Sequence, residues 1–376
     1  MKALVLGCGE MGRFAIKDLV AHGVFAEVVI ACRSVERANS FLAELPWSRT
    51  RTEAVRLDVR DSEALTRLMK GCDVVCNMAG PNYLNAVGVV QAAIAAGVSM
   101  VDVSDDWAAT LEILNLHDEA KKAGITVIVG LGASPGVTNV MARKGADLLD
   151  RTDEVHTAWI MRGSELGGPA LCAHLLYSLP DRAFVFEDGK MQEVRPFVDG
   201  KEVLDFPQLG DVEVMHVGHP EPFTLSRFIE GIKYADDKAT FLPEEVNEMI
   251  VSLGKVAHSG LSVSVDGRAI QPMDFAANYL YEMSKRRMVD VPPVGALRTE
   301  IRGELEGKRT RIIYAAAGRI GIGTGVPAAI GAQLLAIGKI NKPGVYPPEA
   351  CVDPEWFLSA VAARRIGDVE ERIIQE

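Results

Sequence analysis

Residues 2–22 read KALVLGCGEMGRFAIKDLVAH, and this stretch decides the fold. A short apolar run of strand length comes first, then three glycines, then an amphipathic pattern of helical length over Met11–His22. GxGxxG alone is weak evidence, but between a strand and a helix it is typical of a phosphate-binding turn. Gly7 permits the tight turn, Gly9 lets the backbone approach a pyrophosphate, and Gly12 lets the helix pack closely on the strand.

The alternation of strand and helix continues to about residue 131. Alternation with short connections predicts right-handed βαβ units and a parallel sheet, so the fold class is α/β with a doubly wound, Rossmann-type domain. The predicted strands are Ala3–Leu6, Val28–Ala31, Ala54–Leu57, Val74–Asn77, Ser99–Val103 and Thr126–Val129. The predicted helices are Met11–His22, Val35–Leu45, Ser62–Lys70, Ala86–Ala96 and Ala108–Lys122.

The pattern changes after about residue 137. Strands become longer and charged, as in Val155–Met161 and Leu297–Tyr314, and the latter segment turns at Glu306-Gly307-Lys308, which is a hairpin signal. This region predicts a mixed or antiparallel sheet with a few helices. An apolar helix over Pro327–Ile337 and a segment rich in Pro and Gly, residues 342–348, follow it.

Composition limits the classes of function. The chain has 376 residues, of which 48% are apolar and 24% charged, which is the profile of a globular protein with more than one domain. Its net charge of −11 makes nucleic acid and anionic membranes poor candidates for partners. We find no signal-peptide pattern and no membrane span, and the six scattered cysteines lack a CxxC pair. These features predict a cytoplasmic protein without a zinc ribbon or a disulfide scaffold.

The end of the second predicted strand distinguishes NAD from NADP. An NAD site usually carries an acid there to bind the ribose 2′-hydroxyl. This chain instead has Cys32-Arg33-Ser34, with Arg37 one helical turn further on. Arg33 can stack on the adenine and pair with a 2′-phosphate, and Ser34 can add a hydrogen bond. The alternative is an exposed arginine that caps a loop. The pattern favours NADP(H) and leaves NAD(H) possible.

Further cofactor candidates lie at the carboxyl ends of the predicted strands, where such sheets bind their ligands. Asp58 is a candidate for the adenine contact, or it caps the helix over Ser62–Lys70. Residues 79–81 follow the fourth strand, where the nicotinamide half is expected, or they form a plain loop. The full set beside the three glycines, Arg33 and Ser34 is Glu10, Met11, Asp58, Val59, Ala79, Gly80 and Pro81.

Three residues near the expected nicotinamide are candidates for the active site: Asp102 for catalysis, and Ser104 and Ser134 for binding the substrate. Asp102 and Ser104 lie on the same face of the fifth strand. The Asp102 carboxylate could bind a substrate ammonium or relay a proton, or it has a structural hydrogen-bonding role. Ser134 lies in residues 130–139 (GLGASPGVTN), a segment of small residues with a Pro-Gly corner. This segment is a binding loop, a domain hinge or both.

These motifs together resemble the saccharopine dehydrogenase family, most closely its L-lysine 6-dehydrogenase-like branch. The resemblance implies a Rossmann domain for NAD(P) over residues 1–136, an α/β region for substrate and dimerisation over 137–323, and C-terminal helices over 324–376 that pack back on the first domain. It also implies a homodimer and hydride transfer at a C–N bond of an amino acid or imine. Ser134 departs from the Asp of saccharopine reductases, and Arg33 from the acid of the lysine branch. The stretches that carry the resemblance are residues 5–12, 18–20, 101–103, 116–120, 123–128, 131–136, 224–227 and 344–349.

The middle region supplies the remaining candidates. Arg227 is the candidate for holding a substrate carboxylate, because a guanidinium pairs with that group in a bidentate way; the alternative is a surface or interdomain ion pair. His219 and Glu221 are candidates for acid–base chemistry. His216 and His219 are three residues apart, but without cysteines or an HExxH motif we expect no metal. The sequence thus predicts an NAD(P)-dependent oxidoreductase with Asp102 and His219 as proton relays. The alternatives are a catalytically inactive NADP-binding regulator and a carbonyl reductase.

Overall fold

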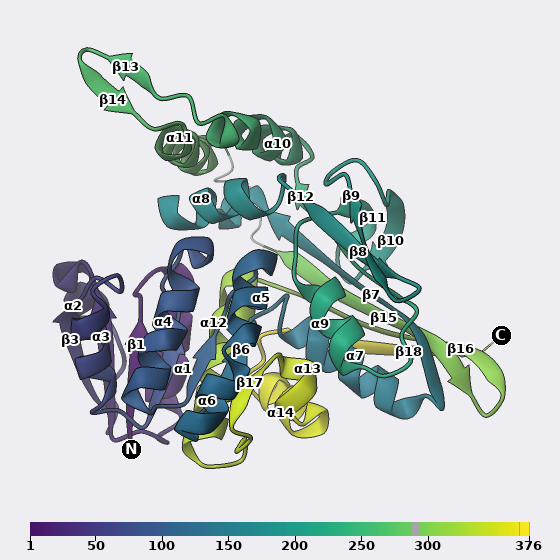
Figure 1. Ribbon diagram of the computed structural model, residues 1–376, viewed down its shortest axis with the longest axis horizontal. Helices are drawn as coiled ribbons and strands as arrows, with labels where there is room; N and C mark the ends of the chain where they lie inside the picture. The colour runs from purple at the N-terminus through teal and green to yellow at the C-terminus, as the bar shows by residue number, and fades with distance from the viewer. Residues whose placement is uncertain (288–293, 368, 376) are drawn as a thin grey trace. The chain divides into compact units, whose positions relative to one another are not determined.

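The computed structural model describes residues 1–287, 294–367 and 369–375. The chain forms two compact units (Figure 1). The first unit consists of Met1–Val140 and Gly321–Arg365, and the second of Met141–Ile320 and Ile366–Glu376. No helix among the described residues is long and apolar enough to span a bilayer.

The first unit is built on a seven-stranded sheet whose strand pairs are all parallel. The strand order is β17-β6-β5-β4-β1-β2-β3, so the first six strands have the doubly wound order that the sequence predicts. The seventh strand comes from the Pro/Gly segment near the end of the chain. The strands are β1 (Lys2–Leu6), β2 (Glu27–Cys32), β3 (Arg51–Arg56), β4 (Val74–Asn77), β5 (Met100–Asp102), β6 (Thr126–Val129) and β17 (Gly344–Tyr346).

The helices of this unit follow the prediction with three main differences, the first being that the helix predicted over Ala86–Ala96 begins at Asn82. The stretch expected to form one helix over Ala108–Lys122 forms two, α5 and α6, which meet at Leu116. The helix expected from Pro327 begins at Ile320, so the proline lies inside it. The helices are α1 (Glu10–Ala21), α2 (Val35–Ala43), α3 (Ser62–Met69), α4 (Asn82–Ala96), α5 (Trp107–Asn115), α6 (His117–Ala123), α12 (Ile320–Ala336), α13 (Pro348–Cys351) and α14 (Pro354–Ala363).

Glycines let α12 pack directly against α1 and the segment after β6. A Cβ at Gly325 would be 2.3 Å from the Met11 carbonyl oxygen in α1, and one at Gly331 would be 2.3 Å from Leu131. Helix α12 is almost entirely buried, which explains its apolar sequence without charged residues. The C-terminal segment thus contributes to the core of the first unit.

The second unit is built on a nine-stranded mixed sheet, in agreement with the predicted α/β class. Its main order is β10-β11-β12-β7-β15-β16-β18, with β8 beside β12 and β9 beside β8. Among the described strands of this sheet, only the β12–β7 pair is parallel. The predicted hairpin is confirmed, and its turn has positive φ at Glu306 and Gly307. The strands are β7 (Arg151–Arg162), β8 (Ala183–Glu187), β9 (Lys190–Val194), β10 (Glu202–Phe206), β11 (Gly210–His216), β12 (Tyr234–Leu242), β15 (Gly295–Leu305), β16 (Lys308–Gly318) and β18 (Val369–Gln375).

This second sheet curls so that its two ends approach each other. Arg372 of β18 pairs with Asp205 of β10 at 2.8 Å, although these strands are at opposite ends of the strand order. Phe206 of β10 packs with Ala158, Ile160 and other apolar side chains inside the curl. The sequence predicts only helices after residue 324, so β18 is a correction. It forms because its backbone pairs with the exposed edge of β16.

Helices cover the second unit, and one hairpin stands apart from its sheet. Helices α8, α10 and α11 pack on one another. The strands β13 (Val263–Val265) and β14 (Arg268–Ile270) pair only with each other among the described strands. The helical segments are α7 (Val137–Leu148), η1 (Gly163–Glu165), α8 (Pro169–Ser178), α9 (Glu221–Phe228), α10 (Glu245–His258) and α11 (Pro272–Arg287).

Candidate functional site

The glycine turn after β1 has the geometry of a phosphate-binding loop. Gly7 has φ +93° and a Cβ there would be 2.7 Å from the Met78 carbonyl oxygen, so the fold itself requires glycine. A Cβ at Gly12 would be 2.4 Å from the Gly7 carbonyl oxygen. At Gly9 a Cβ would meet no atom within 4 Å. The middle glycine therefore leaves open space at the N-terminus of α1, where a pyrophosphate fits. Glu10 and Met11 open this helix.

Arginines surround the carboxyl ends of β2 and β3. The exposed Arg33 side chain has no hydrogen bond or ion pair within the described residues. Arg56 donates to the Arg33 carbonyl oxygen at 2.8 Å and pairs with Glu36 at 2.5 Å. The Ser34 hydroxyl caps α2 by accepting a hydrogen bond from the Arg37 backbone at 3.4 Å. The charge of Arg33 also contributes to lowering the pKa of Asp58, so this edge offers an exposed guanidinium near Asp58 where a 2′-phosphate is expected.

The structure corrects one alternative for Asp58. The cap of α3 is Asp61, whose carboxylate accepts a hydrogen bond from Ala64 at 3.0 Å. Asp58 instead binds the Arg60 guanidinium with both oxygens, and this contact holds the pKa of Asp58 well below its usual range. The half-buried Val59 lies between them. The adenine contact proposed for Asp58 and Val59 stays a prediction.

A buried hydrogen-bond network holds the turn after β4. Asp102 is fully buried and accepts hydrogen bonds from the Asn77 side chain at 2.6 Å and from the Ser104 backbone at 2.7 Å. Asn77 in turn accepts the Ala79 N–H at 3.1 Å, just before Gly80 and Pro81. Burial raises the pKa of Asp102 to about 6, although both hydrogen bonds oppose the shift.

Ser104 presents a further group at this end of the sheet. Its buried hydroxyl has no hydrogen-bond partner within the described part of the chain. A buried polar group without a partner is costly, so such a group in a binding region is a ready donor for a ligand.

The Ser134 loop is tied to the C-terminal segment of the first unit. The Ser134 hydroxyl accepts a hydrogen bond from Thr138 at 3.2 Å, and Gly136 N–H donates to the Asn139 side chain at 2.9 Å. Asn139 donates to Glu349 of α13 at 3.0 Å, which fixes the loop from a residue 210 positions away. Sequence reasoning missed Asn139 and Glu349 as partners, although both lie in or beside stretches that carried the resemblance.

The second unit contains a buried histidine with two carboxylates. The Nδ1 atom of His219 lies 2.9 Å from Glu221 and 3.4 Å from Asp237. Asp237 also accepts hydrogen bonds from Thr157 at 2.6 Å and from Trp159 at 3.0 Å. Burial and the nearby Glu221 raise the pKa of Asp237 well above its usual range. The sequence analysis named His219 and Glu221 but missed Asp237, which comes from β12.

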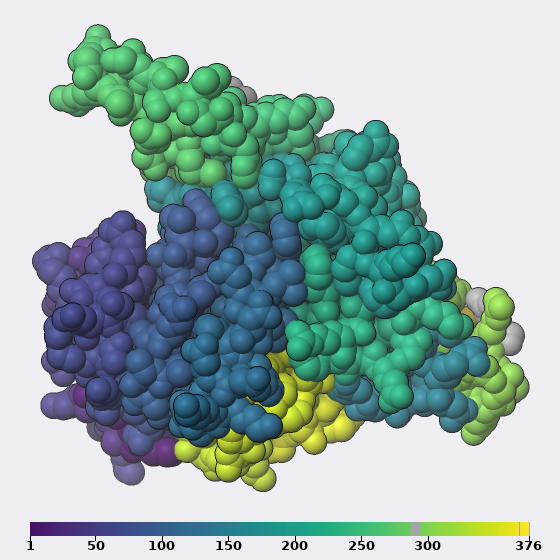
Figure 2. Space-filling view, in the orientation of Figure 1, coloured from purple at the N-terminus to yellow at the C-terminus, as the bar shows by residue number. Residues whose placement is uncertain are grey.

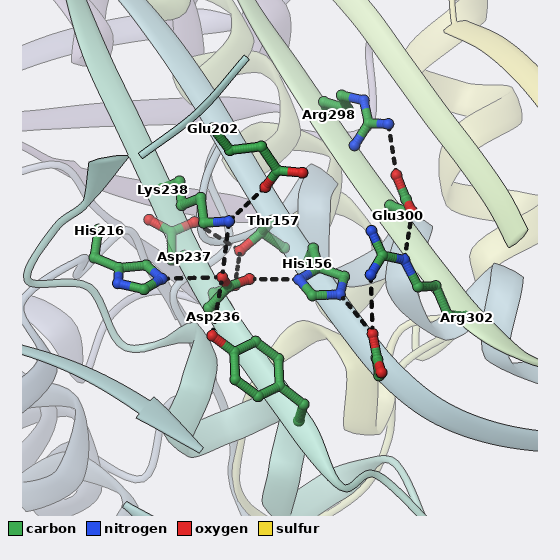
Figure 3. A network of polar contacts seen from close by, with 12 residues as sticks. His156, Thr157, Glu202, His216, Asp236, Asp237, Lys238, Arg298, Glu300 and Arg302 are labelled. Atoms are coloured by element: carbon green, nitrogen blue, oxygen red, sulfur yellow. Dashed lines mark hydrogen bonds and ion pairs between the residues drawn. The ribbon is translucent and has the colours of Figure 1, made fainter. Parts of the chain in front are cut away.

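His216 does not share a site with His219. It binds Asp236, while His219 binds Asp237, and consecutive side chains of β12 point to opposite faces of the sheet. Figure 3 shows Asp236 between His156 and His216, with Lys238 close to it. Among the described residues, the ligand atoms of His219, Glu221 and Asp237 lie within 4.8 Å of one another, so these three are the group that could hold a metal ion. The expectation of no metal stays a prediction.

Arg227 lies in the last turn of α9 with its guanidinium exposed. It lies over the Phe228 ring at 5.4 Å and has no ion pair within the described residues. The structure thus gives no support to the alternative of an ion pair within the second unit. An arginine held by an aromatic face, with its donors open, remains able to bind a carboxylate.

Comparison with known proteins identifies the first unit. Residues 3–128 match the family described as Saccharopine dehydrogenase NADP binding domain. The chain is thus saccharopine dehydrogenase-like. Over almost its full length it is similar to carboxyaminopropylagmatine dehydrogenase of Synechocystis, with 25% identity over 95% of this chain and 94% of the relative. It is also similar to carboxynorspermidine synthase of Vibrio cholerae, with 26% identity over 99% of this chain and 97% of the relative.

The fold agrees with that of a solved saccharopine dehydrogenase. The apo L-Glu-forming enzyme of Saccharomyces cerevisiae superposes with a TM-score of 0.69 over 99% of both chains, at 16% identity. This saccharopine dehydrogenase-like chain therefore has the fold that the resemblance implied. The comparisons confirm the predicted family and the class of NAD(P)-binding oxidoreductases. They do not distinguish the lysine 6-dehydrogenase-like branch, which stays a prediction.

Proposed function

We propose that the chain is an NADP-dependent oxidoreductase that reduces an imine, formed from an amine and a carbonyl compound, to a secondary amine. The observation that carries this proposal is the glycine turn, with its open space at Gly9, in a domain of the saccharopine dehydrogenase NADP-binding family. The relatives that match almost the whole chain are named for carboxylated polyamine-like and agmatine-like compounds. A carboxylated polyamine-like secondary amine is therefore the proposed product class, and the corresponding imine is the proposed substrate.

The first unit would hold the cofactor through its strand ends. Gly7, Gly9 and Gly12, with Glu10 and Met11, would hold the pyrophosphate at the N-terminus of α1. Arg33 would pair with the 2′-phosphate, which is the reason that we favour NADP over NAD. The bound cofactor supplies the hydride, and the protein supplies orientation and proton transfer.

Asp102 is proposed as a positioning residue. Each of its carboxylate oxygens accepts a hydrogen bond within the first unit. Through Asn77, Asp102 fixes the turn at residues 79–81. This turn would lie beside the nicotinamide half, while the free Ser104 hydroxyl would donate to it. The ionised Asp102 carboxylate can accept the hydrogen bonds of both the Asn77 side chain and the Ser104 N–H. A protonated carboxyl has fewer acceptor positions, which weakens this arrangement.

His219 and Arg227 are proposed for the substrate. Glu221 and Asp237 contact the Nδ1 atom of His219, and this histidine would exchange a proton with the nitrogen of the imine or amine. Arg227 would bind the substrate carboxylate, and Ser134 would hydrogen-bond a polar group of the substrate. The free cysteines of the described chain are compatible with the proposed cytoplasmic location.

A substrate panel tests the proposal in the oxidative direction. The purified chain is mixed with NADP⁺ and, in turn, carboxynorspermidine, carboxyaminopropylagmatine, saccharopine and lysine, and the absorbance of NADPH is followed. Oxidation of one of the first two compounds is the expected result. Oxidation of lysine alone would instead favour the lysine 6-dehydrogenase-like interpretation. Cofactor binding without turnover of any of these compounds, and without turnover of carbonyl compounds with NADPH, would point to an inactive regulator and reject the proposal.

A matched pair of variants tests the cofactor site itself. A Cβ at Gly9 meets no protein atom within 4 Å, so Gly9→Val should fold but lose NADPH binding because its side chain enters the open space. Gly88→Val on α4, where a Cβ also meets no atom within 4 Å, is the control. Equal NADPH affinity of the two variants, measured by calorimetry, would contradict the assignment of the glycine turn.

The choice of NADP over NAD depends on Arg33. Arg33→Ala should weaken NADPH binding roughly 10- to 100-fold, because a charge-assisted hydrogen bond contributes about 1.5–3 kcal/mol, and should leave NADH binding unchanged. Arg67→Ala, an exposed arginine of α3, is the control. A wild-type chain that binds NADH as tightly as NADPH would reject the preference.

A further inference from the structure

Two consecutive acids follow β5 in the first unit, and only one of them caps a helix. Asp106 is buried and caps α5, because its carboxylate accepts a hydrogen bond from the Ala109 N–H at 2.7 Å. Asp105 is half-buried, and its carboxylate accepts a hydrogen bond from the Asn82 side chain at 2.8 Å. This contact ties Asp105 to the first residue of α4. Helix capping therefore explains Asp106 and leaves the role of Asp105 to be found.

Two buried oxygen atoms of the same pair of helices have no hydrogen-bond partner within the described part of the chain. They are Oδ1 of Asn85 and Oγ1 of Thr110, whose residue is only 2% exposed. Asn85 lies one turn after Asn82 on the same face of α4, and Thr110 lies one turn after Asp106 in α5. The two helices pack on each other (Figure 1). Because a buried polar atom without a partner is costly, these two oxygens indicate a ligand that donates hydrogen bonds.

The charge of this part of the first unit favours a cation. Residues 71–120, which include β4, α4, β5 and α5, contain no lysine or arginine. Burial raises the pKa of Asp102, and the nearby charge of Asp105 adds to this shift. The exposed arginines Arg33 and Arg60 instead follow β2 and β3, which lie on the other side of β1 in the sheet. Figure 2 shows the purple surface of these early segments on the left of the first unit and the blue surface of α4 and α5 to their right. One side of the sheet thus carries positive charge for a phosphate, and the other carries negative charge.

A primary ammonium group matches these acceptors. It has three donors and no acceptor, so it can bind a carboxylate and two neutral oxygens at once, whereas an anion would meet the charges of Asp102 and Asp105. We infer that Asp105, together with Asn85 and Thr110, binds the substrate ammonium group that is remote from the C–N bond being reduced. This inference rests on the proposed imine reduction. It moves the ammonium-binding role considered for Asp102, which is fully buried, to a carboxylate that is only half-buried.

Calorimetry on the full chain loaded with NADP⁺ tests this inference. The probes are carboxynorspermidine and the same compound acetylated at the amine remote from its carboxylate. The wild type should bind the first compound roughly 10- to 100-fold more tightly, because acetylation removes a charge-assisted hydrogen bond. Asp105→Asn keeps an acceptor for Asn82 but loses the charge, so it should bind both compounds about as weakly as the wild type binds the acetylated one.

Two further variants separate Asp105 from the general charge of the segment and from a structural role. Glu112→Gln removes a negative charge from an exposed position of α5 and is the matched control, which should keep the wild-type preference. Thr110→Val removes the unpaired hydroxyl, so it should weaken binding of carboxynorspermidine at least threefold without lowering the urea concentration at which the chain unfolds. A purely structural Thr110 would leave that affinity unchanged. Equal NADPH affinity of all variants shows that each one is folded.

The outcomes distinguish the ammonium site from the proposed reaction. A wild type that binds neither compound or binds both equally, or an Asp105→Asn variant that keeps the preference, would overturn the inference even if the substrate panel shows turnover. Loss of the preference in Glu112→Gln would mean that the charge of the whole segment attracts the amine, and would also overturn it. A preference that Asp105→Asn removes, without turnover of any panel compound, would reject the proposed reaction and support the ammonium site.

Discussion

The buried ion network of the second sheet makes folding stability depend on pH in a calculable way. His156 of β7 lies 2.8 Å from Asp236 and 3.1 Å from Glu154. Burial alone lowers the pKa of the His156 imidazole, but the attraction of Asp236 and Glu154 is larger and raises it to about 9. We predict that protonated His156 stabilises the native state near neutral pH.

The magnitude follows from proton linkage. The unfolded pKa of histidine is about 6.5, so a native pKa of about 9 corresponds to roughly 3 kcal/mol of stability. Because the native pKa of His156 is the higher one, this stability is fully present below about pH 6.5 and is lost as the pH rises toward 9. At about pH 8.5 less than about 1 kcal/mol remains.

Urea unfolding of wild type and His156→Gln at about pH 6 and about pH 8.5 measures this contribution. The variant should be less stable at the lower pH, and the difference from wild type should shrink by about 2 kcal/mol at the higher pH. The variant retains all six cysteines, whose titration above neutral pH therefore cancels in the comparison. His258→Gln, on the exposed end of α10, is the histidine-to-glutamine control.

A constant difference between wild type and His156→Gln at the two pH values would refute the reasoning. It would mean that His156 is neutral in the native state and that Asp236 is held by its other partners, His216 and Lys238. The ionisation of Asp236 does not contribute to the pH dependence of stability between about pH 6 and about pH 8.5. The pKa of Asp236 is lowered by His156, His216 and Lys238 despite its burial, so its contribution is lost only in acid.

Three further outcomes are expected. If the chain has the proposed activity, kcat/KM should fall as the pH drops through about 6, where Asp102 takes up a proton, and Asp102→Asn should abolish that inflection; an unchanged profile would exclude a role for its charge. Alkylation of Cys8, which lies inside the glycine turn, should block NADPH binding, and bound NADPH should slow the alkylation, as a thiol-labelling time course would show. Gly325→Val should destabilise the chain by about 1–3 kcal/mol or more in urea unfolding, because its Cβ meets the backbone of α1, whereas Gly323→Ala, whose Cβ has 3.8 Å of room, should not.

The first unit was predictable because its pattern is local. Each βαβ repeat contains its own strand, turn and helix within about 30 residues, so hydrophobic periodicity shows the element and its position. The glycine spacing then marks the binding edge. The strand β17 was not predictable in this way. It is only three residues long, Gly344–Tyr346, and its pairing partner β6 lies more than 200 residues earlier in the chain.

The second unit was only partly predictable because some of its charged side chains lie inside the curled sheet. Arg298, Glu300 and Arg302 alternate along β15, which is the pattern of a solvent-facing strand. Glu300 is instead only 2% exposed and binds both arginines at 2.6 Å. The curl of the sheet covers this face, and mutual pairing offsets the cost of removing the charges from water. Neither the curl nor the pairing leaves a local signal in the sequence.

Asp236 and Asp237 show why the histidine–carboxylate site of the second unit could not be predicted in full from the sequence. Two consecutive acids in a buried strand look redundant, and the spacing of His216 and His219 looks like a pair of metal ligands. The alternation of side chains along β12 separates these four residues into two pairs on opposite faces. One carboxylate, Asp236, is ionised in a network of cations, and the other, Asp237, has a raised pKa beside Glu221. A single residue of register along β12 therefore decides which carboxylate each histidine contacts, Asp236 for His216 and Asp237 for His219.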